Sequence, residues 1–314
     1  MISEREITSL KNCTPRVDRP IFFIGAPRSG TTIVFEAFSS HSNLAWFSNF
    51  LHRFPGHPIV SVVSRLAISP NLMGWKRQNG ESRFRIPRPY AVECFPAWER
   101  CCGRKFRFDF LSNQTVSETD KRNTIELVSR VTKYQGKQRF TAKITGPPRI
   151  CYLDSIFPDA FFIHIMRDGR AVSNSLMRVG FWKKGGGFER PWWTGGLTQE
   201  DMETYDRYDK SPLVLAAIQW RRIILAAKEE ASRIAPQRYL QVKYEDILRE
   251  PLSFMDKLIE FSELPASEKV ETYVRKKSRF RDMNFKFAHD LSGRDLTVLN
   301  EVIGDVNSSL GYTV

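Results

Sequence analysis

Short segments rich in apolar residues recur along the chain and are separated by longer, more polar stretches. The first reads Ile21-Phe22-Phe23-Ile24, and another runs from Phe161 to Met166. Residues that are apolar on consecutive rather than alternating positions are typical of strands buried on both faces of a sheet. The pattern predicts buried strands near residues 20–24, 139–144, 161–166 and 238–243.

The stretches between these strands predict helices. The clearest is expected at 212–235, because Ser211-Pro212 suits a cap and a first turn and Pro236 stops the helix. The other helices are expected near residues 30–40, 121–135, 149–157, 168–179, 251–263 and 291–302. Strands that alternate with helices indicate a parallel sheet, so we expect an α/β fold with three layers, α/β/α, around a central parallel sheet.

The length and composition limit the class of protein. A chain of 314 residues can bury a full core, and we expect one domain over residues 1–314. It has no run of about 18 apolar residues, so we expect no transmembrane helix. Residues 1–20 lack the apolar stretch of a signal peptide, and the five cysteines are odd in number and show no metal-ligand spacing. These features favour a cytoplasmic protein with reduced thiols and no bound metal.

A glycine-bounded loop, Gly25-Ala26-Pro27-Arg28-Ser29-Gly30-Thr31-Thr32, follows the first predicted strand and precedes a predicted helix. Such a unit points backbone N–H groups and the positive end of a helix dipole at one small volume, which is an anion site. A nucleotide triphosphatase would carry lysine where this chain has Thr31. The basic residue lies within the loop instead, at Arg28. The loop is therefore P-loop-like, and we expect it to bind a phosphate that is not part of a triphosphate.

A second phosphate-binding pattern follows the strand predicted at 161–166. Arg167 stands where this strand ends, and Ser175 lies about two helical turns further on. Ligands of open α/β sheets bind beyond the carboxyl ends of the strands, so both side chains should face the same edge as the loop. An arginine fork and a hydroxyl are suitable donors for a dianionic phosphate.

Together these two patterns resemble the cofactor motifs of sulfotransferases that use 3′-phosphoadenosine 5′-phosphosulfate (PAPS), most closely the protein-tyrosine and bacterial sulfotransferases. The resemblance covers roughly residues 20–50 and 139–265. It implies transfer of a sulfuryl group from PAPS to a hydroxyl or amine by in-line displacement, with release of 3′-phosphoadenosine 5′-phosphate. It also implies that Arg167 and Ser175 bind the 3′-phosphate, and that the 5′-phosphosulfate is held by Pro27, Arg28, Ser29, Gly30, Thr31 and Thr32.

Two shorter matches add to the resemblance. Lys143 ends a predicted strand about where sulfotransferases place a lysine near the sulfonate. Tyr244 begins a Tyr-Glu-Asp sequence that resembles one of the family, and this implies that the Tyr244 ring packs on adenine. Charge grows on the bridging oxygen during transfer, so nearby cations stabilise the transition state. Arg28 and Lys143 are the candidates for this catalytic role.

The general base cannot be carried over from the family. Cytosolic sulfotransferases have a Lys-x-His pattern at this strand end, but position 145 is Thr. Tyrosine sulfotransferases have a glutamate about twenty residues after the loop arginine, where this chain reads Ser48-Asn49. The remaining candidates to deprotonate the acceptor are ionisable residues of the unmatched regions: Glu93, His52, His57 and His41.

The acceptor is not readable from the sequence. We expect an insert at about 46–115 to build its pocket and a glycine- and tryptophan-containing lid at about 180–212 to cover it. A small molecule, a lipid, a carbohydrate and a peptide all remain open, as does the oligomeric state. The net charge of +13 includes basic segments at 76–107 and 275–281, which could contact acidic surfaces or, in the second case, cover the cofactor. No nucleic-acid-binding motif is present, so we expect no nucleic acid partner.

Two other functions compete with the sulfotransferase. A P-loop-like nucleotide kinase would use the same loop, although the missing lysine argues against it. A non-catalytic anion-binding protein of the same fold would explain why neither base of the family is found.

Overall fold

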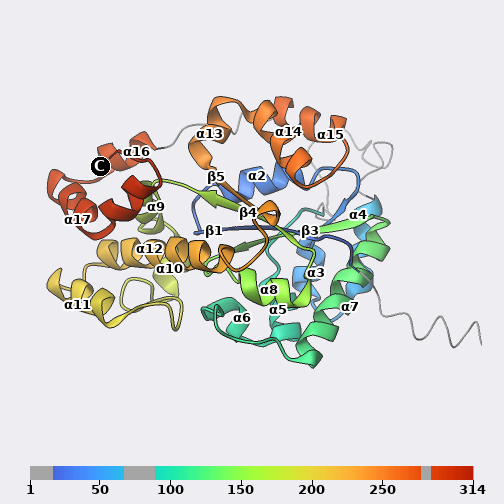
Figure 1. Ribbon diagram of the computed structural model, residues 1–314, viewed down its shortest axis with the longest axis horizontal. Coiled ribbons are helices and arrows are strands. Elements are labelled where there is room, and N and C mark those ends of the chain that lie inside the picture. Colours follow the sequence, from blue (N-terminus) through green and yellow to red (C-terminus); the bar gives the residue numbers. More distant parts are fainter. Residues whose placement is uncertain (1–16, 67–88, 277–283, 314) are drawn as a thin grey trace, which may run out of the picture.

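The computed structural model describes residues 17–66, 89–276 and 284–313. Five strands form one sheet in the order β2-β3-β1-β4-β5, and every neighbouring pair is parallel. The sheet crosses the centre of the molecule (Figure 1). The strands are β1 (Ile21–Gly25), β2 (Leu44–Ala45), β3 (Arg139–Thr145), β4 (Phe161–Met166) and β5 (Tyr239–Lys243).

Helices connect the strands and cover both faces of the sheet. Up to β3 they are α2 (Thr31–Phe38), α3 (Asn49–Arg53), the 3-10 helix η1 (Pro58–Val62), α4 (Val63–Leu66), α5 (Phe95–Cys102), α6 (Lys105–Phe108) and α7 (Glu118–Gln135). From β3 to β5 they are α8 (Ile150–Ile156), α9 (Gly169–Leu176), α10 (Gly180–Lys184), α11 (Gln199–Arg207), α12 (Pro212–Ala231) and the 3-10 helix η2 (Pro236–Arg238). After β5 they are α13 (Tyr244–Arg249), α14 (Pro251–Phe261), α15 (Glu268–Lys276), α16 (Phe285–Asp290) and α17 (Gly293–Ser309).

The central strand β1 is buried on both faces, and its side chains alternate between two cores. Ile21 and Phe23 pack among residues of α2, α13, α14 and α15, whereas Phe22 and Ile24 pack among residues of α5, α7, α8 and α12. Figure 1 shows these two helical layers on opposite sides of the sheet. The predicted α/β fold with a central parallel sheet is confirmed.

A third core lies beyond the sheet edge, where α9, α12 and α17 meet the segment 180–212. Trp182 and Trp193 are buried there. The glycines of this segment allow the rings to approach: a Cβ at Gly185 would lie 1.4 Å from the Trp192 ring, and one at Gly187 would lie 2.6 Å from Trp182. The glycines therefore serve close aromatic packing.

The four strands expected from the sequence are all present, and the seven expected helices match α2, α7, α8, α9, α12, α14 and α17. The ends differ in places, since α12 ends at Ala231 rather than 235 and α17 continues to Ser309 rather than 302. The two-residue strand β2 and the helices α3, α4, α5, α6, α10, α11, α13, α15 and α16 were not predicted. None of them is longer than nine residues, and short elements carry little periodicity unless a recognisable motif precedes them. Among the described helices, none is both long and apolar enough to cross a membrane.

Candidate functional site

The carboxyl ends of β1, β3 and β4 meet at one edge of the sheet. Gly25 at the end of β1 is paired in register with Thr145 at the end of β3. On the other side Ile24 is paired with His164 of β4, so Arg167 follows the same edge. The loop after β1 thus begins between the two segments that carry the predicted lysine and arginine.

The loop brings the start of α2 to this edge through glycines that no other residue could replace without strain. Gly25 has a φ of 151° and a Cβ there would lie 2.4 Å from the Ile165 carbonyl oxygen. Gly30 has a φ of 85°, and a Cβ there would lie 2.2 Å from the ring of Tyr244. Gly30 is the N-cap of α2, and no side chain caps this helix or places a negative charge in its first turn. The N–H groups of that turn are therefore available to an anion.

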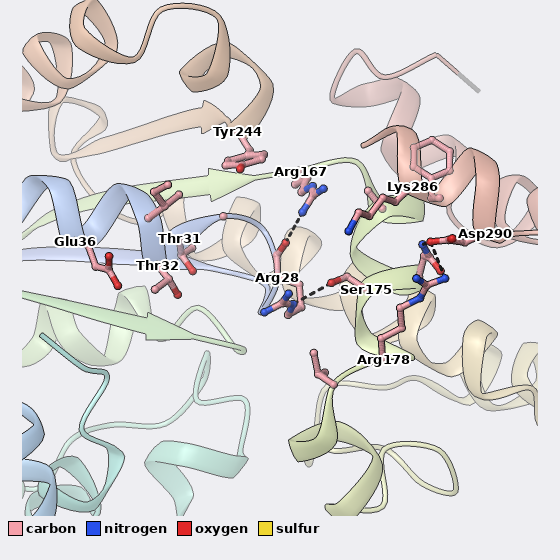
Figure 2. A pocket seen from close by; sticks show the side chains of 16 residues that line it. Arg28, Thr31, Thr32, Glu36, Arg167, Ser175, Arg178, Tyr244, Lys286 and Asp290 are labelled. Atoms are coloured by element: carbon pink, nitrogen blue, oxygen red, sulfur yellow. Dashed lines mark hydrogen bonds and ion pairs between the residues drawn. The ribbon is translucent and has the colours of Figure 1, made fainter. Parts of the chain in front are cut away.

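A cavity of about 700 Å³ lies beside the loop and receives side chains from both predicted motifs (Figure 2). Its polar and charged lining residues are Arg28, Thr31, Thr32, Glu36, Arg167, Asn174, Ser175, Arg178, Tyr244, Lys286 and Asp290. We call this cavity the donor pocket. The Arg28 Nε donates to Ser175 Oγ at 2.9 Å, and the Arg167 guanidinium donates to the Arg28 carbonyl oxygen at 3.1 Å. The two motifs, far apart in the sequence, are thus joined directly.

Arg167 is held toward the donor pocket rather than toward its acidic neighbour. Asp168 is paired with Arg170, with a guanidinium nitrogen at 2.7 Å from a carboxylate oxygen. The Arg167 Nε instead donates to Asn284 Oδ1 at 2.7 Å, and its guanidinium carbon lies 5.1 Å from the centre of the Tyr244 ring. Arg167 is only 8% exposed, so its orientation is fixed by contacts on several sides.

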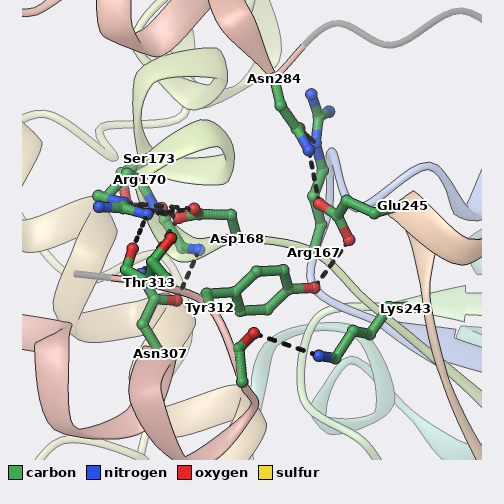
Figure 3. A network of polar contacts seen from close by, with 12 residues as sticks. Arg167, Asp168, Arg170, Ser173, Lys243, Glu245, Asn284, Asn307, Tyr312 and Thr313 are labelled. Carbon is green, nitrogen blue, oxygen red and sulfur yellow. Dashed lines mark hydrogen bonds and ion pairs between the residues drawn. The ribbon is translucent and has the colours of Figure 1, made fainter.

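The C-terminal segment supports this arrangement, as Figure 3 shows. Asn284 donates to one oxygen of Glu245 at 2.7 Å, and the Tyr312 hydroxyl donates to the other at 2.9 Å. Asn307 of α17 donates to Asp168 and accepts from the Gly169 N–H. The C-terminal elements are thereby tied to the end of β4.

Helix α16 forms the far wall of the donor pocket. Its last residue, Asp290, accepts a hydrogen bond from Asn174 at 3.0 Å and forms an ion pair with Arg178 at 2.7 Å. These contacts bring Lys286 and Phe287 to the pocket. Lys286 was not found from the sequence, because it stands in a short, mixed-charge segment that matches no motif.

A second cavity of about 260 Å³ borders the same loop, and we call it the acceptor pocket after the acceptor expected from the sequence. It shares Arg28, Thr31 and Thr32 with the donor pocket. Its other lining residues are Pro27, Glu93, Phe95, Arg107, Thr145, Phe181, Trp192 and Trp193. Four aromatic side chains and six polar or charged side chains thus line this pocket.

Lys143 lies behind the wall that the two cavities share. Its Nζ donates to Thr32 Oγ1 at 2.8 Å and lies 3.3 Å from Glu93 Oε1. The Thr145 hydroxyl donates to the same Glu93 oxygen at 2.8 Å. The Glu93 side chain is 24% exposed and lines the acceptor pocket. Of the base candidates, Glu93 is thus fixed beside the predicted catalytic lysine.

The three histidine candidates lie elsewhere. His52 and His57 are exposed, and His41 is 1% exposed with its ring bonded to the Pro265 carbonyl oxygen at 2.8 Å. Burial lowers the pKa of His41, which fits a neutral structural residue. None of the three lines either cavity.

The remaining predicted cofactor residues differ in how they meet the donor pocket. Tyr244 lines it but is 6% exposed, with its ring against Gly30. Ser29 is fully buried and lines neither cavity, so only its backbone is placed to contribute. Pro27 lines the acceptor pocket instead of the donor pocket. Within the described ranges, no group of three or more His, Cys, Asp or Glu could hold a metal ion.

The basic segments fall partly outside the described residues. Lys76, Arg77, Arg83, Arg85 and Arg88 lie outside them, and so do residues 277–281. Of the second segment, Arg275 and Lys276 end α15. Of the first, Arg107 reaches the acceptor pocket.

Comparison with known proteins places this geometry in context. The chain is 20% identical over 254 residues to protein-tyrosine sulfotransferase A of Caenorhabditis elegans, which is 80% of this chain and 51% of that protein. The chain thus spans about half the length of this curated relative.

Two solved structures share the fold. Sulfotransferase STF9 of Mycobacterium avium is 14% identical, with a TM-score of 0.57 over 95% of this chain and 78% of that chain. Sulfotransferase STF1 of Mycobacterium tuberculosis H37Rv is 13% identical, with a TM-score of 0.56 over 94% of this chain and 79% of that chain.

The description of the matching family decides between the functions considered above. A model of the sulfotransferase family matches residues 20–268, which include the loop after β1, the strand of Lys143 and the end of β4. Neither the nucleotide kinase nor the non-catalytic anion-binding protein is favoured by these matches. The chain belongs to the sulfotransferase family.

Proposed function

We propose that this protein transfers a sulfuryl group from PAPS to a hydroxyl or amine acceptor and releases 3′-phosphoadenosine 5′-phosphate. One observation carries the proposal: the donor and acceptor pockets share Arg28, Thr31 and Thr32 of one loop, and Lys143 contacts both Thr32 and Glu93 of the acceptor pocket. In-line transfer needs the leaving oxygen of the donor and the attacking oxygen of the acceptor on opposite sides of the transferred sulfur, with cations close by to stabilise the growing charge.

The donor pocket fits a nucleotide with two separate phosphate groups. The uncapped first turn of α2 offers N–H donors to one anion, while Arg167, Ser175 and Lys286 offer donors to a second. A volume of about 700 Å³ is ample for such a nucleotide. When bound, PAPS supplies an activated sulfuryl group on a phosphate leaving group.

The chain's own residues supply orientation and charge. Thr31 and Thr32 begin α2 and would hold the 5′-phosphosulfate together with the backbone of the loop. Arg28 and Lys143 bring positive charge to the point where the two pockets meet, and would stabilise negative charge on the leaving oxygen.

Glu93 is the proposed general base. Its carboxylate lines the acceptor pocket, and one oxygen is held by Thr145 and Lys143. A carboxylate in this position would accept the proton of an acceptor hydroxyl as the new bond forms, a contribution of roughly 100- to 10,000-fold in rate for general bases.

The acceptor is proposed to be a small molecule, a lipid or a carbohydrate, bound by the insert at 46–115 and the lid at 180–212. Glu93, Phe95 and Arg107 come from the first segment, and Phe181, Trp192 and Trp193 come from the second. We also propose that the protein is cytoplasmic and that residues 1–314 form one domain.

Calorimetric titration with 3′-phosphoadenosine 5′-phosphate tests the proposal, with ATP and magnesium as the comparison. We expect micromolar binding of the bisphosphate and little binding of ATP. Turnover of radiolabelled PAPS over a panel of hydroxyl and amine acceptors then tests transfer. Tight ATP binding without binding of the bisphosphate would overturn the assignment.

A further inference from the structure

A fully buried arginine fixes one side of the acceptor pocket. Arg149 is 0% exposed, and its guanidinium donates to the carbonyl oxygens of Phe106, Arg107 and Pro147, the bond to Arg107 being 2.9 Å long. Phe106 and Arg107 belong to α6, whereas Pro147 follows β3. Arg149 therefore locks the backbone of α6 to the strand end that carries Lys143 and Thr145.

Burial of this guanidinium has a large desolvation cost, which lowers the pKa of Arg149 to about 9. The nearby Glu230, itself buried, offsets part of this cost and accepts hydrogen bonds from Ser112 and the Cys151 N–H. Fixing the position of α6 thus requires two buried charged groups. The residue of α6 that lines the acceptor pocket is Arg107.

The side chain of Arg107 is held as well. Its guanidinium carbon lies 5.5 Å from the centre of the Phe95 ring and 5.0 Å from that of Phe108. One nitrogen donates to Glu99 at 3.4 Å and forms an ion pair with it, at a distance that is long for a hydrogen bond. The Arg107 side chain makes no other hydrogen bond within the described part of the chain, and 40% of its surface is exposed. A guanidinium has five N–H donors, so most of them can meet a ligand.

We propose that the acceptor of this protein carries an anionic group, a carboxylate, phosphate or sulfate, that Arg107 binds while the acceptor hydroxyl lies at Glu93. This inference rests on the proposed function and narrows its acceptor class. A fixed guanidinium fork matches the planar or bidentate geometry of these anions. The aromatic side chains Phe181, Trp192 and Trp193 line the same pocket and suit an apolar body between the two polar groups.

The test compares acceptors that differ only in the anion. Para-hydroxyphenylacetate is titrated against para-hydroxyphenylacetamide, and ω-hydroxylaurate against its amide, each with the protein saturated by 3′-phosphoadenosine 5′-phosphate. We expect the acid of at least one pair to bind the wild type about tenfold more tightly than its amide. Arg107→Gln should abolish the preference.

Arg104→Gln is the matched control, because Arg104 contacts the same Phe108 ring at 5.5 Å but does not line the pocket. Arg107→Lys keeps the charge without the fork and should retain part of the preference. The proposal is overturned if the wild type shows no preference for the acid in either pair, including no binding at all. It is also overturned if the preference survives in a folded Arg107→Gln protein.

The same titrations separate this inference from the proposed function. Saturation by the bisphosphate in the first step reports on the donor pocket alone. Binding of the bisphosphate without an acid preference would sink the acceptor assignment and leave the donor assignment standing, whereas failure of the first step would sink both.

Discussion

The donor pocket and the acceptor pocket meet at the same strand ends but are built differently. The donor pocket takes its anion site from the backbone of one continuous loop and from residues directly after β4. The acceptor pocket is lined mainly by side chains of two separate segments, 93–107 and 181–193, whose positions depend on long-range packing. A backbone site leaves a local sequence signature, whereas a site made by packed side chains does not.

The glycines illustrate this difference. Gly30 is required by its own backbone conformation and by the ring of Tyr244, so its place in the loop can be recognised from the local motif. Gly185 is required by the ring of Trp192, seven residues further along the same segment. The loop of Gly30 matches a motif that can be recognised in the sequence, whereas the segment around Gly185 matches no motif, so the fold that brings its ring onto the glycine becomes visible only in the structure.

The largest expected effect is a loss of catalysis at the acceptor pocket with almost no change in binding at the donor pocket. Glu93→Gln should lower kcat by about a thousandfold, because the amide cannot accept the acceptor's proton. It should leave the Kd of 3′-phosphoadenosine 5′-phosphate within about twofold, since Glu93 does not line the donor pocket. Both are measured with labelled PAPS, the best acceptor of the panel, and calorimetry.

The control for this variant is His52→Gln, which changes an exposed histidine outside both pockets. It should keep the wild-type kcat. If Glu93→Gln retained more than about a tenth of the wild-type rate, Glu93 could not be the base.

A substitution in the donor pocket should instead weaken binding of the bisphosphate. Arg167→Ala removes a charged donor that lines the donor pocket, and should raise the Kd of 3′-phosphoadenosine 5′-phosphate about ten- to a hundredfold. Calorimetry measures this, with Arg249→Ala as a control at an exposed arginine of α13 that lines neither pocket. Near-normal binding by the Arg167 variant would show that Arg167 does not bind the bisphosphate.

Acid should destabilise the whole fold, and with it both pockets, through a buried histidine of the central sheet. His164 of β4 is buried, and burial lowers its pKa from an ordinary 6.5 to about 4. The unfolded chain therefore binds a proton that the folded chain excludes, so the free energy of unfolding falls as the pH falls from about 6.5 to about 4. Between pH 7 and pH 5 this amounts to about 2 kcal/mol.

Urea unfolding at these two pH values measures the effect. His164→Gln should reduce the pH dependence, whereas His52→Gln should not. An unchanged dependence in the His164 variant would show that other groups account for the acid sensitivity.

The smallest effect concerns the support of the base. Thr145→Val removes the hydrogen bond to Glu93 but keeps the shape of the side chain, and should lower kcat about tenfold through poorer orientation of the carboxylate. Thr145→Ser keeps a hydroxyl and should restore most of the rate. Steady-state kinetics on both variants decide, and equal rates for valine and serine would remove Thr145 from the mechanism.

The sequence could predict the sheet and most of the donor pocket, because buried strands and strand-end motifs are local patterns. Arg167, Ser175 and the loop residues were predicted in this way, and the structure places Arg167, Ser175, Arg28, Gly30, Thr31 and Thr32 around one cavity, whereas Pro27 and Ser29 do not line it. Lys286 was missed, since α16 reaches the pocket only through the contacts of Asp290 with α9.

The acceptor pocket could be predicted only as a pair of unmatched segments. Glu93 was one of four candidates, and its contacts with Lys143 and Thr145 join residues about fifty positions apart in the sequence. Arg107 was one basic residue among many, and what distinguishes it is the buried Arg149 behind its backbone. Pairings of this kind depend on the whole fold and leave no periodic signal.

Lys143 gives the two ligands a common counter-ion. A single ammonium group contacts Thr32, which lines both pockets, and Glu93, which lines the acceptor pocket. A change in its position or hydration caused by one ligand alters the free energy of binding the other, and thermodynamic linkage makes this influence equal in both directions. We therefore expect the affinities of donor and acceptor to be coupled rather than additive, so that each ligand's apparent dissociation constant depends on the concentration of the other.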